Sequence, residues 1–386
     1  MSHYEKLKMT ADADAGSFVR ELRGQTGTGF QEKTHVHKDW WATTISYDDA
    51  MENLQRSAEE REDILAPVKN ISAVVNEDGE FAFDVQGREF VPTDWSLQQF
   101  SIRSKVPSST VIQKLRLQED FDEDDAAVMA ALGNNALRRL DQDKIYRMRT
   151  YTDGTCRAFV TDRYAPIDNR WYLEQLRTNL PEGRLSHWRG DEDTIFGNIL
   201  LPDTIIDYGQ SDDSDYGGMM SIGNCEIGKR RIQQVPSLFR SICLNGCIWG
   251  QVEGSAIKKR HIGTIDLVEL GGQIAANINE QLPLLPMGVR KLLELREMEV
   301  QDVTMKSVFA AVAMENKFSR TEASEVFGQW VDNERQDKNL FGVVNAITRA
   351  GQVFNNQSWV KFDQIGGSML DMSESRWSGL VSRADT

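Results

Sequence analysis

Hydrophobic residues recur with two different periods along this chain. Between residues 66 and 263 they form short runs that alternate with polar residues, as in Phe81–Val85 and Ile145–Tyr151. After residue 263 they recur every three to four residues, in segments 265–282, 287–298, 303–314, 321–330 and 340–354. Strands have the first period and amphipathic helices the second. The sequence therefore predicts an α+β fold: an antiparallel sheet with hairpins packed on helices, followed by an all-helical C-terminal region.

The same change of period predicts the domain organisation. The first 45 residues are small and polar, so we expect a partly flexible extension, with Trp40 and Trp41 docked on the body. One helix begins at Ser46, where Asp49 completes a Ser-x-x-acid capping pattern, and it runs to a charged end near Asp63. The predicted parts are an N-terminal extension, an α+β core domain and a helical C-terminal region, at residues 1–65, 66–263 and 264–386.

Turn and capping signals predict individual elements of the core domain. Asp153-Gly154 between two alternating runs is typical of a β-hairpin. Asn169 is expected to cap the helix that follows it. Pro236 suits the first turn of a helix, which runs to Cys243 and which Asn245-Gly246 would end in left-handed geometry.

Charge and composition limit the partners and the compartment. The formal net charge of −15 argues against a protein coated with nucleic acid on all sides. No apolar run approaches the roughly 18 residues of a membrane span, and the N-terminus lacks the apolar segment of a signal peptide. Four cysteines without a regular framework are typical of reduced thiols. We therefore expect a cytoplasmic protein with no membrane partner.

Basic residues are concentrated in two islands of this acidic chain. Residues 144–171 carry six Lys and Arg against three Asp, and residues 225–263 carry seven against Glu226 and Glu253. Like charges repel one another, so their clustering indicates a surface with a use. If the islands meet on one face, they can hold the phosphates of a nucleic-acid strand while aromatic rings stack on its bases. Ordinary solvated surface is the alternative.

The candidate nucleic-acid-binding residues come from these islands: Arg147, Arg149, Tyr151, Arg163, Tyr164, Lys229, Arg230, Arg231, Lys258, Lys259 and Arg260. Alternation along the first arm of the hairpin places Arg147, Arg149 and Tyr151 on one strand face. Arg240 has a second interpretation, because it lies in an apolar stretch and can pair with a buried acid such as Glu226.

The sequence contains none of the common catalytic or cofactor motifs. It has no glycine loop ending in Gly-Lys-Ser/Thr, no Gly-x-Gly-x-x-Gly after a strand and no Gly-x-Ser-x-Gly. Cys225, Cys243, Cys247 and His261 are too scattered for a zinc site, so buried thiols are the better interpretation. We therefore predict no catalytic residue, no metal and no cofactor.

Four segments of the chain resemble a known family. They are Thr161-Asp-Arg-Tyr-Ala-Pro-Ile-Asp-Asn169, Asn224-Cys-Glu-Ile-Gly228, Phe239-Arg-Ser-Ile-Cys-Leu-Asn-Gly246 and Arg260-His-Ile-Gly263. In this order they look like the phage/plasmid-like protein family of unknown function, whose members occur in phages, prophages and conjugative elements. The likeness covers roughly residues 66–360, and it implies the cytoplasm of a bacterial host.

The resemblance also implies a structural role for the residues of these segments: Asn224, Glu226, Gly228, Arg240, Cys243, Asn245, Gly246 and His261. Cys225 stands where the family has serine, which weakens any metal role for this thiol. A hairpin followed by a helix and further strands is similar, at the level of the fold, to the ring-forming single-strand annealing proteins of phages. Those proteins hold a strand in a basic groove.

Three functions from different classes fit these observations. The leading hypothesis is single-stranded DNA binding, including strand annealing, by a homo-oligomer in recombination or replication of a phage or mobile element; RNA is the alternative strand. The second is a non-enzymatic phage structural or host-interaction protein that self-assembles through the aromatic residues Trp330, Phe341, Phe354 and Trp359. The third is a metal-dependent nuclease that uses carboxylates of the acidic loops.

Overall fold

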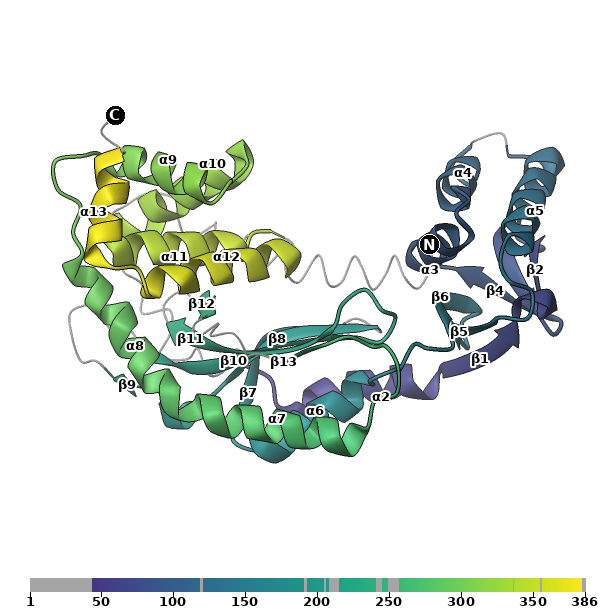
Figure 1. Cartoon of the computed structure of the whole chain (residues 1–386), viewed down its shortest axis with the longest axis horizontal. Helices are drawn as coiled ribbons and strands as arrows, with labels where there is room; N and C mark the ends of the chain where they lie inside the picture. The colour runs from purple at the N-terminus through teal and green to yellow at the C-terminus, as the bar shows by residue number, and fades with distance from the viewer. Residues whose placement is uncertain are drawn as a thin grey trace. The chain divides into compact units, whose positions relative to one another are not determined.

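The computed structural model describes residues 44–118, 121–190, 193–204, 206–207, 215–240, 245–248, 257–335, 337–354 and 356–383. They all belong to one compact unit, Ala42–Thr386. The α+β fold expected from the sequence is confirmed, since two largely antiparallel sheets with their helices are followed by an all-helical region (Figure 1). The expected docking of Trp40 and Trp41 lies outside the described residues.

The first sheet has six strands in the order β1-β5-β6-β4-β3-β2. They are β1 (Arg61–Pro67), β2 (Ile71–Val75), β3 (Phe81–Val85), β4 (Arg88–Pro92), β5 (Ile145–Tyr151) and β6 (Thr155–Thr161). All neighbours pair antiparallel except β4 and β6, which are parallel. The β5–β6 hairpin turns at Asp153-Gly154, and Gly154 has the positive φ of 78° that this turn signal predicts.

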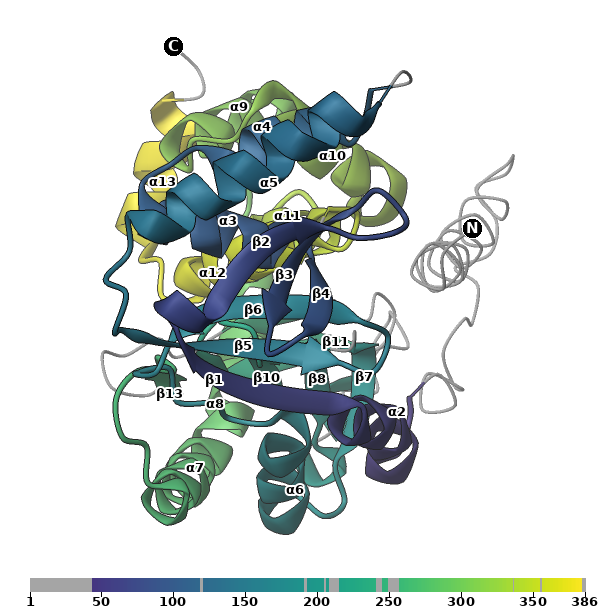
Figure 2. The same ribbon diagram turned by 90° about the vertical axis from the view of Figure 1, so that its right-hand side faces the viewer.

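Helices α3 (Asp94–Ser104), α4 (Ser108–Leu115) and α5 (Glu123–Arg138) share a hydrophobic core with this sheet (Figure 2). The ring centroid of Phe83 lies 5.1 Å from that of Phe100 in α3 and 5.3 Å from that of Phe159 in β6. Gly133 lets α5 approach β2 closely, because a Cβ there would lie 2.5 Å from the Ala73 Cβ. Aromatic packing of this kind fixes α3 firmly against β6.

The second sheet follows the order β12-β11-β10-β8-β7, with β13 paired to β11 and β9 to β10. Its strands are β7 (Arg184–Gly190), β8 (Thr194–Leu200), β9 (Ile206–Asp207), β10 (Asp215–Cys225), β11 (Ile232–Arg240), β12 (Asn245–Ile248) and β13 (Ile257–Lys259). Two helices from earlier in the chain, α2 (Tyr47–Glu59) and α6 (Asn169–Asn179), contribute buried residues to the core of this sheet.

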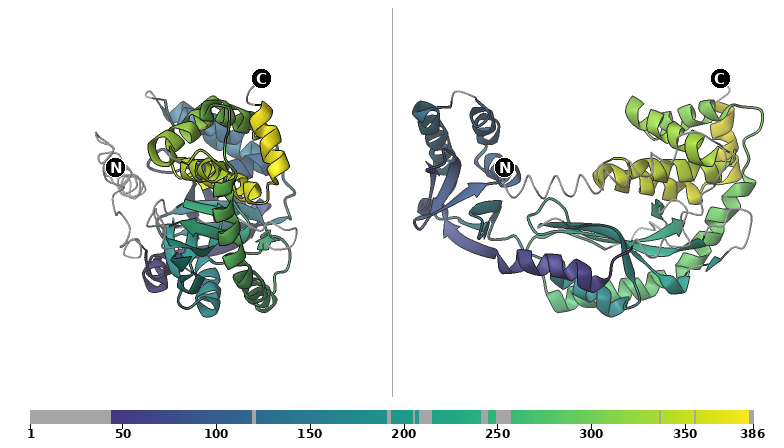
Figure 3. Two further views of the ribbon diagram at one scale, coloured as in Figure 1. Left: turned by 90° about the vertical axis from the view of Figure 1, so that its left-hand side faces the viewer. Right: turned by 180° about the vertical axis from the view of Figure 1, so that it is seen from behind.

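The C-terminal region consists of seven helices among the described residues: α7 (Leu267–Gln281), α8 (Leu285–Glu294), α9 (Met305–Glu315), α10 (Arg320–Gln329), α11 (Leu340–Gly351), α12 (Asn356–Leu370) and α13 (Glu374–Arg383). In Figures 1 and 3, α6 and α7 lie on one side of the second sheet and α11 and α12 on the other. Eleven of the twelve residues of α11 are buried, which makes it the central helix of this region.

The aromatic residues expected to form a self-assembly surface are mostly part of the core. Trp330 and Phe341 are buried, and Phe354 is half-buried. The side chain of Trp359 lies outside the described residues. These rings fill the helical core, so they do not supply an exposed partner surface. No helix in the described part of the chain is long and apolar enough to cross a membrane.

Several expected elements differ from those observed. The segment from Pro236 to Arg240 is strand β11 rather than a helix, and Asn245-Gly246 begins strand β12 rather than a helix end. Pro236 pairs with Met220 of β10, so the strand continues through this proline. A strand with apolar residues on both faces cannot be told from a helix by periodicity.

The boundary expected between the N-terminal extension and the core domain also differs from the structure. The helix that begins at the Ser46–Asp49 cap is confirmed, with the Asp49 amide donating to Ser46 Oγ at 3.1 Å. It ends at Glu59, however, and Asp63 lies in β1, which pairs with β5. The expected boundary at residue 65 therefore falls inside a strand of the first sheet.

Candidate nucleic-acid interface

The turn between β10 and β11 carries the basic run Lys229-Arg230-Arg231, and helix α3 holds this turn in place. Trp95 Nε1 and Gln99 Nε2 donate to the Ile227 carbonyl at 2.9 and 2.8 Å. The Oε1 atom of the buried Gln99 accepts from the Phe159 amide of β6 at 2.8 Å. Because one amide side chain joins β6 to the turn, the basic run has a fixed position.

The loop after β6 meets the segment after β13. The Ala165 amide donates to the His261 carbonyl at 3.2 Å, and the Gly263 amide donates to the Arg163 carbonyl at 2.8 Å. The rings of Tyr164 and His261 stack, with centroids 5.5 Å apart and planes 8° apart. Tyr164 Oη donates to the Glu226 carbonyl at 2.8 Å, which connects this pair to the β10–β11 turn.

Gly228 in this turn has a φ of +78°, which favours glycine. A Cβ at this position would lie 3.4 Å from the Tyr164 ring. Three of the four segments that carry the family resemblance therefore meet at one place: 161–169, 224–228 and 260–263. The structural role that the resemblance implies for Asn224, Glu226, Gly228 and His261 stays a prediction.

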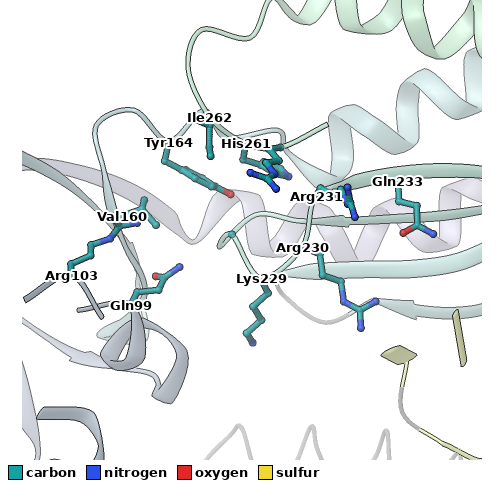
Figure 4. Close-up of a pocket in the computed structure, with 12 residues that line it drawn as sticks. Gln99, Arg103, Val160, Tyr164, Lys229, Arg230, Arg231, Gln233, His261 and Ile262 are labelled. Carbon is teal, nitrogen blue, oxygen red and sulfur yellow. The ribbon is translucent and has the colours of Figure 1, made fainter. Parts of the chain in front are cut away.

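These segments and α3 enclose a pocket with a volume of about 570 Å³ (Figure 4). Its lining residues are Gln99, Arg103, Val160, Tyr164, Gly228, Lys229, Arg230, Arg231, Gln233, Arg260, His261 and Ile262. Five of them are cations and none is a carboxylate. An open, cationic hollow of this kind attracts anions.

The cations of the pocket have no carboxylate partner among the residues that the structure describes. Within the described parts of the chain, none of the five side chains forms an ion pair with Asp or Glu. Arg103 donates to the Phe159 carbonyl at 3.3 Å, and Lys229 Nζ lies 6.0 Å from the centre of the Trp95 ring. Their charges are therefore available to an anionic ligand.

His261 differs from the other basic residues because it is neutral. Its residue surface is 4% exposed, and neither ring nitrogen meets hydrogen-bond geometry with a partner in the described part of the structure, although the Ala165 backbone lies close enough to interact with the ring. Burial lowers the pKa of His261 from 6.5 to about 4, while the backbone of Ala165 acts in the opposite direction and the charge of Arg149 adds to the lowering. At neutral pH the ring can offer one hydrogen-bond donor and one acceptor.

The depressed pKa of His261 makes stability fall in mild acid. The unfolded chain binds a proton near pH 6.5 and the folded chain only near pH 4, so the folded state loses about 3 kcal/mol as the pH drops through this window. We expect His261→Phe, which keeps a ring beside Tyr164, to remove this part of the pH dependence. Urea denaturation of both proteins between pH 7 and pH 4 measures it, and parallel pH profiles would contradict the assignment.

The sequence led us to expect that Arg147, Arg149 and Tyr151 contact a ligand, but in the structure they are not available to one. Arg149 is 1% exposed, and its Nε and Nη2 atoms donate to the two oxygens of Asp63 at 2.8 and 2.9 Å. Arg147 donates to the same carboxylate at 2.8 Å. Tyr151 is buried, and its hydroxyl donates to Asp193 at 2.9 Å. Arg149 and Tyr151 are part of the interior of the protein, and the half-buried Arg147 is paired with Asp63.

Glu226 is the centre of this buried cluster of charges. Its carboxylate forms ion pairs with Arg61 and, at 3.4 Å, with Arg149. It also accepts from the backbone amide of Asn169 at 2.6 Å, which is the first residue of α6. Asn169 was expected to cap this helix; instead the Glu226 carboxylate does so from another element, where the helix dipole favours an anion.

The charges of the cluster shift one another's proton affinity. Burial opposes the charge of Arg149, yet the hydrogen bonds and charge of Asp63 outweigh it and raise the pKa of Arg149. Burial acts to raise the pKa of Asp63, but the two arginines lower it overall. For Glu226 burial dominates and raises the pKa, although Arg61 and Arg149 oppose this. The cluster links the first sheet to the second rather than facing a ligand.

The remaining predicted residues are distributed as follows. Arg163 and Lys259 are exposed and do not line the pocket. The side chains of Lys258 and Asn245, and Cys243 as a whole, lie outside the described residues, and Gly246 pairs with Phe239 through its backbone. The buried Cys225 accepts from Thr194 Oγ1 at 3.3 Å.

Arg240 pairs with a buried acid, but with Glu334 rather than Glu226. Its Nη1 atom lies 3.0 and 3.1 Å from the two Glu334 oxygens, and its guanidinium lies 5.1 Å from the centre of the Phe341 ring. This pair joins β11 to the helical region. The described residues of the segment 239–246, which are 239–240 and 245–246, do not line the pocket.

Five residues of the pocket were missed from the sequence: Gln99, Arg103, Val160, Gln233 and Ile262. Gln99 and Arg103 lie four residues apart on α3, but nothing in their own segment indicates that it meets the β10–β11 turn. In the described part of the chain, no group of three or more His, Cys, Asp or Glu could hold a metal ion.

Comparisons with known proteins give no further guide to this site. No protein-family model, curated protein or solved structure matched the chain. The resemblance to phage and plasmid proteins therefore stays a prediction from the sequence.

Proposed function

We propose that this protein binds single-stranded DNA through the basic pocket. The observation that carries the proposal is the pocket lining, with five cations and no carboxylate in a chain of net charge −15. A binding surface confined to one hollow agrees with that charge balance, since the rest of the acidic protein repels a second strand.

A single strand suits the shape of the site better than a duplex does. The pocket is hollow, and its cations come from α3, the β10–β11 turn and the segment after β13. A single strand can bend and turn a phosphate and a base into such a hollow, whereas a duplex keeps its bases stacked inside. The resemblance to phage and plasmid proteins supports a role in recombination or replication of a mobile element.

Salt dependence of binding tests the proposal. We expect the wild-type chain to bind a fluorescent single-stranded oligonucleotide in low salt, with a slope of log affinity against log salt of about −3, because about four phosphates would each contribute roughly −0.7. Fluorescence anisotropy between about 20 and 300 mM salt measures the slope. No binding at the lowest salt, or an affinity that salt does not change, would refute the proposal.

Competition experiments define the preferred strand. Unlabelled duplex DNA and single-stranded RNA of the same sequence are added to the preformed complex, and we expect the duplex to compete least.

Homo-oligomerisation, expected from the sequence, remains a prediction; light scattering with and without DNA tests it.

A further inference from the structure

One wall of the basic pocket has an apolar side chain that phosphate binding does not require. Ile262 is 57% exposed, although most other residues of the lining are charged or polar. Its backbone pairs with Tyr164, so its position is fixed by the same contact that stacks Tyr164 on His261. In Figure 4, Ile262, Tyr164 and His261 lie together on one side of the pocket, and Lys229 and Arg230 extend away from them.

Two neutral polar side chains of the pocket lining have atoms without a hydrogen-bond partner in the described part of the structure. Both ring nitrogens of the buried His261 and the Nε2 atom of Gln233 lack hydrogen bonds in the described part of the structure. A buried polar group without a partner costs stability, so native proteins rarely keep one without a use. Uncharged donors and acceptors match the edge of a nucleobase better than they match a phosphate.

We propose that the pocket receives one nucleobase of the bound strand, with Ile262 against the face of the base and His261 at its edge. This inference rests on the proposed function and adds a base-binding subsite to it. The cations hold the flanking phosphates, since Arg231 and Arg260 line the same hollow as His261. An anion without a base, such as a polyphosphate or an acidic peptide, would leave Ile262 and the imidazole without a role.

A comparison of two strands with equal charge tests this subsite. An oligothymidylate and an abasic strand of the same length present the same phosphates, and only the first has bases. We expect the wild-type chain to bind the oligothymidylate roughly tenfold more tightly. Ile262→Ala and His261→Phe should each reduce this ratio to about threefold or less, with the loss confined to the strand that carries bases.

Matched controls separate the subsite from general effects. Met314→Ala removes an apolar side chain that is 74% exposed on α9, far along the chain from the pocket segments, and should leave the ratio unchanged. Arg230→Gln should weaken both strands alike. Equal binding of the two strands by the wild-type chain would overturn the inference and leave the proposed function intact. A ratio of affinities that neither pocket variant changes would have the same consequence. Absence of binding to either strand would remove both.

Discussion

Replacing Arg149 by methionine is expected to lower the free energy of unfolding by about 3–5 kcal/mol. Methionine keeps an unbranched, flexible side chain but loses the two hydrogen bonds to Asp63 and the one, at 3.0 Å, to the Glu226 carbonyl. The half-buried Asp63 and the buried Glu226 then keep one arginine each, Arg147 and Arg61 respectively. Removing one partner of a buried ion pair leaves a charge without full compensation. Urea denaturation at pH 7 measures the loss.

Arg170→Met is the matched control for this variant. Arg170 forms an ion pair with Glu174 at 3.0 Å on the surface of α6, where both side chains are nearly half exposed. Pairs of this kind contribute less than about 1 kcal/mol, because solvent screens the charges and both side chains are ordered at an entropic cost. Equal losses in the two variants would show that burial does not decide the strength of the Arg149 pairs.

Local signals predicted the hairpin that carries Arg149. Alternating residues on both sides of Asp153-Gly154 specify strands and turn within one short segment, and β5 and β6 are found there. The faces of the hairpin could not be predicted in the same way. Asp63 and Glu226 are 86 and 77 residues from Arg149 in the chain. A strand pattern does not show which distant element will cover a face, so arginines that looked exposed are buried.

Only part of the basic pocket could be predicted, because a sequence pattern does not show which distant segments will meet. The runs around Arg230 and Arg260 are visible as charge clusters in the sequence, and the structure brings them to one hollow. Arg103 and Gln99 come from α3, whose packing on β6 depends on the aromatic core of the first sheet. Helix α3 has no unusual charge of its own. Its contribution to the site becomes visible only when the tertiary contacts are known.

Replacing Arg230, Arg231 and Arg260 together by glutamine is expected to weaken binding of single-stranded DNA about 100-fold at low salt. The three residues supply most of the cations in the pocket lining, and none of them has an acidic partner in the described chain that its loss would leave unpaired. If each contacts a phosphate, the slope of log affinity against log salt should also become shallower by about two. Anisotropy titrations at several salt concentrations measure both quantities.

A second triple variant shows whether the effect is local. Lys306, Arg320 and Arg335 are exposed residues of the helical region, and their replacement by glutamine changes the net charge of the protein by the same amount. Long-range attraction is screened beyond roughly 10 Å at 0.1 M salt. At that salt concentration, cations outside the pocket should therefore contribute little to the affinity for DNA. Similar losses in both triple variants would mean that DNA responds to the overall charge. A loss restricted to the pocket variant, together with a shallower salt slope, would mean that phosphates lie against Arg230, Arg231 and Arg260.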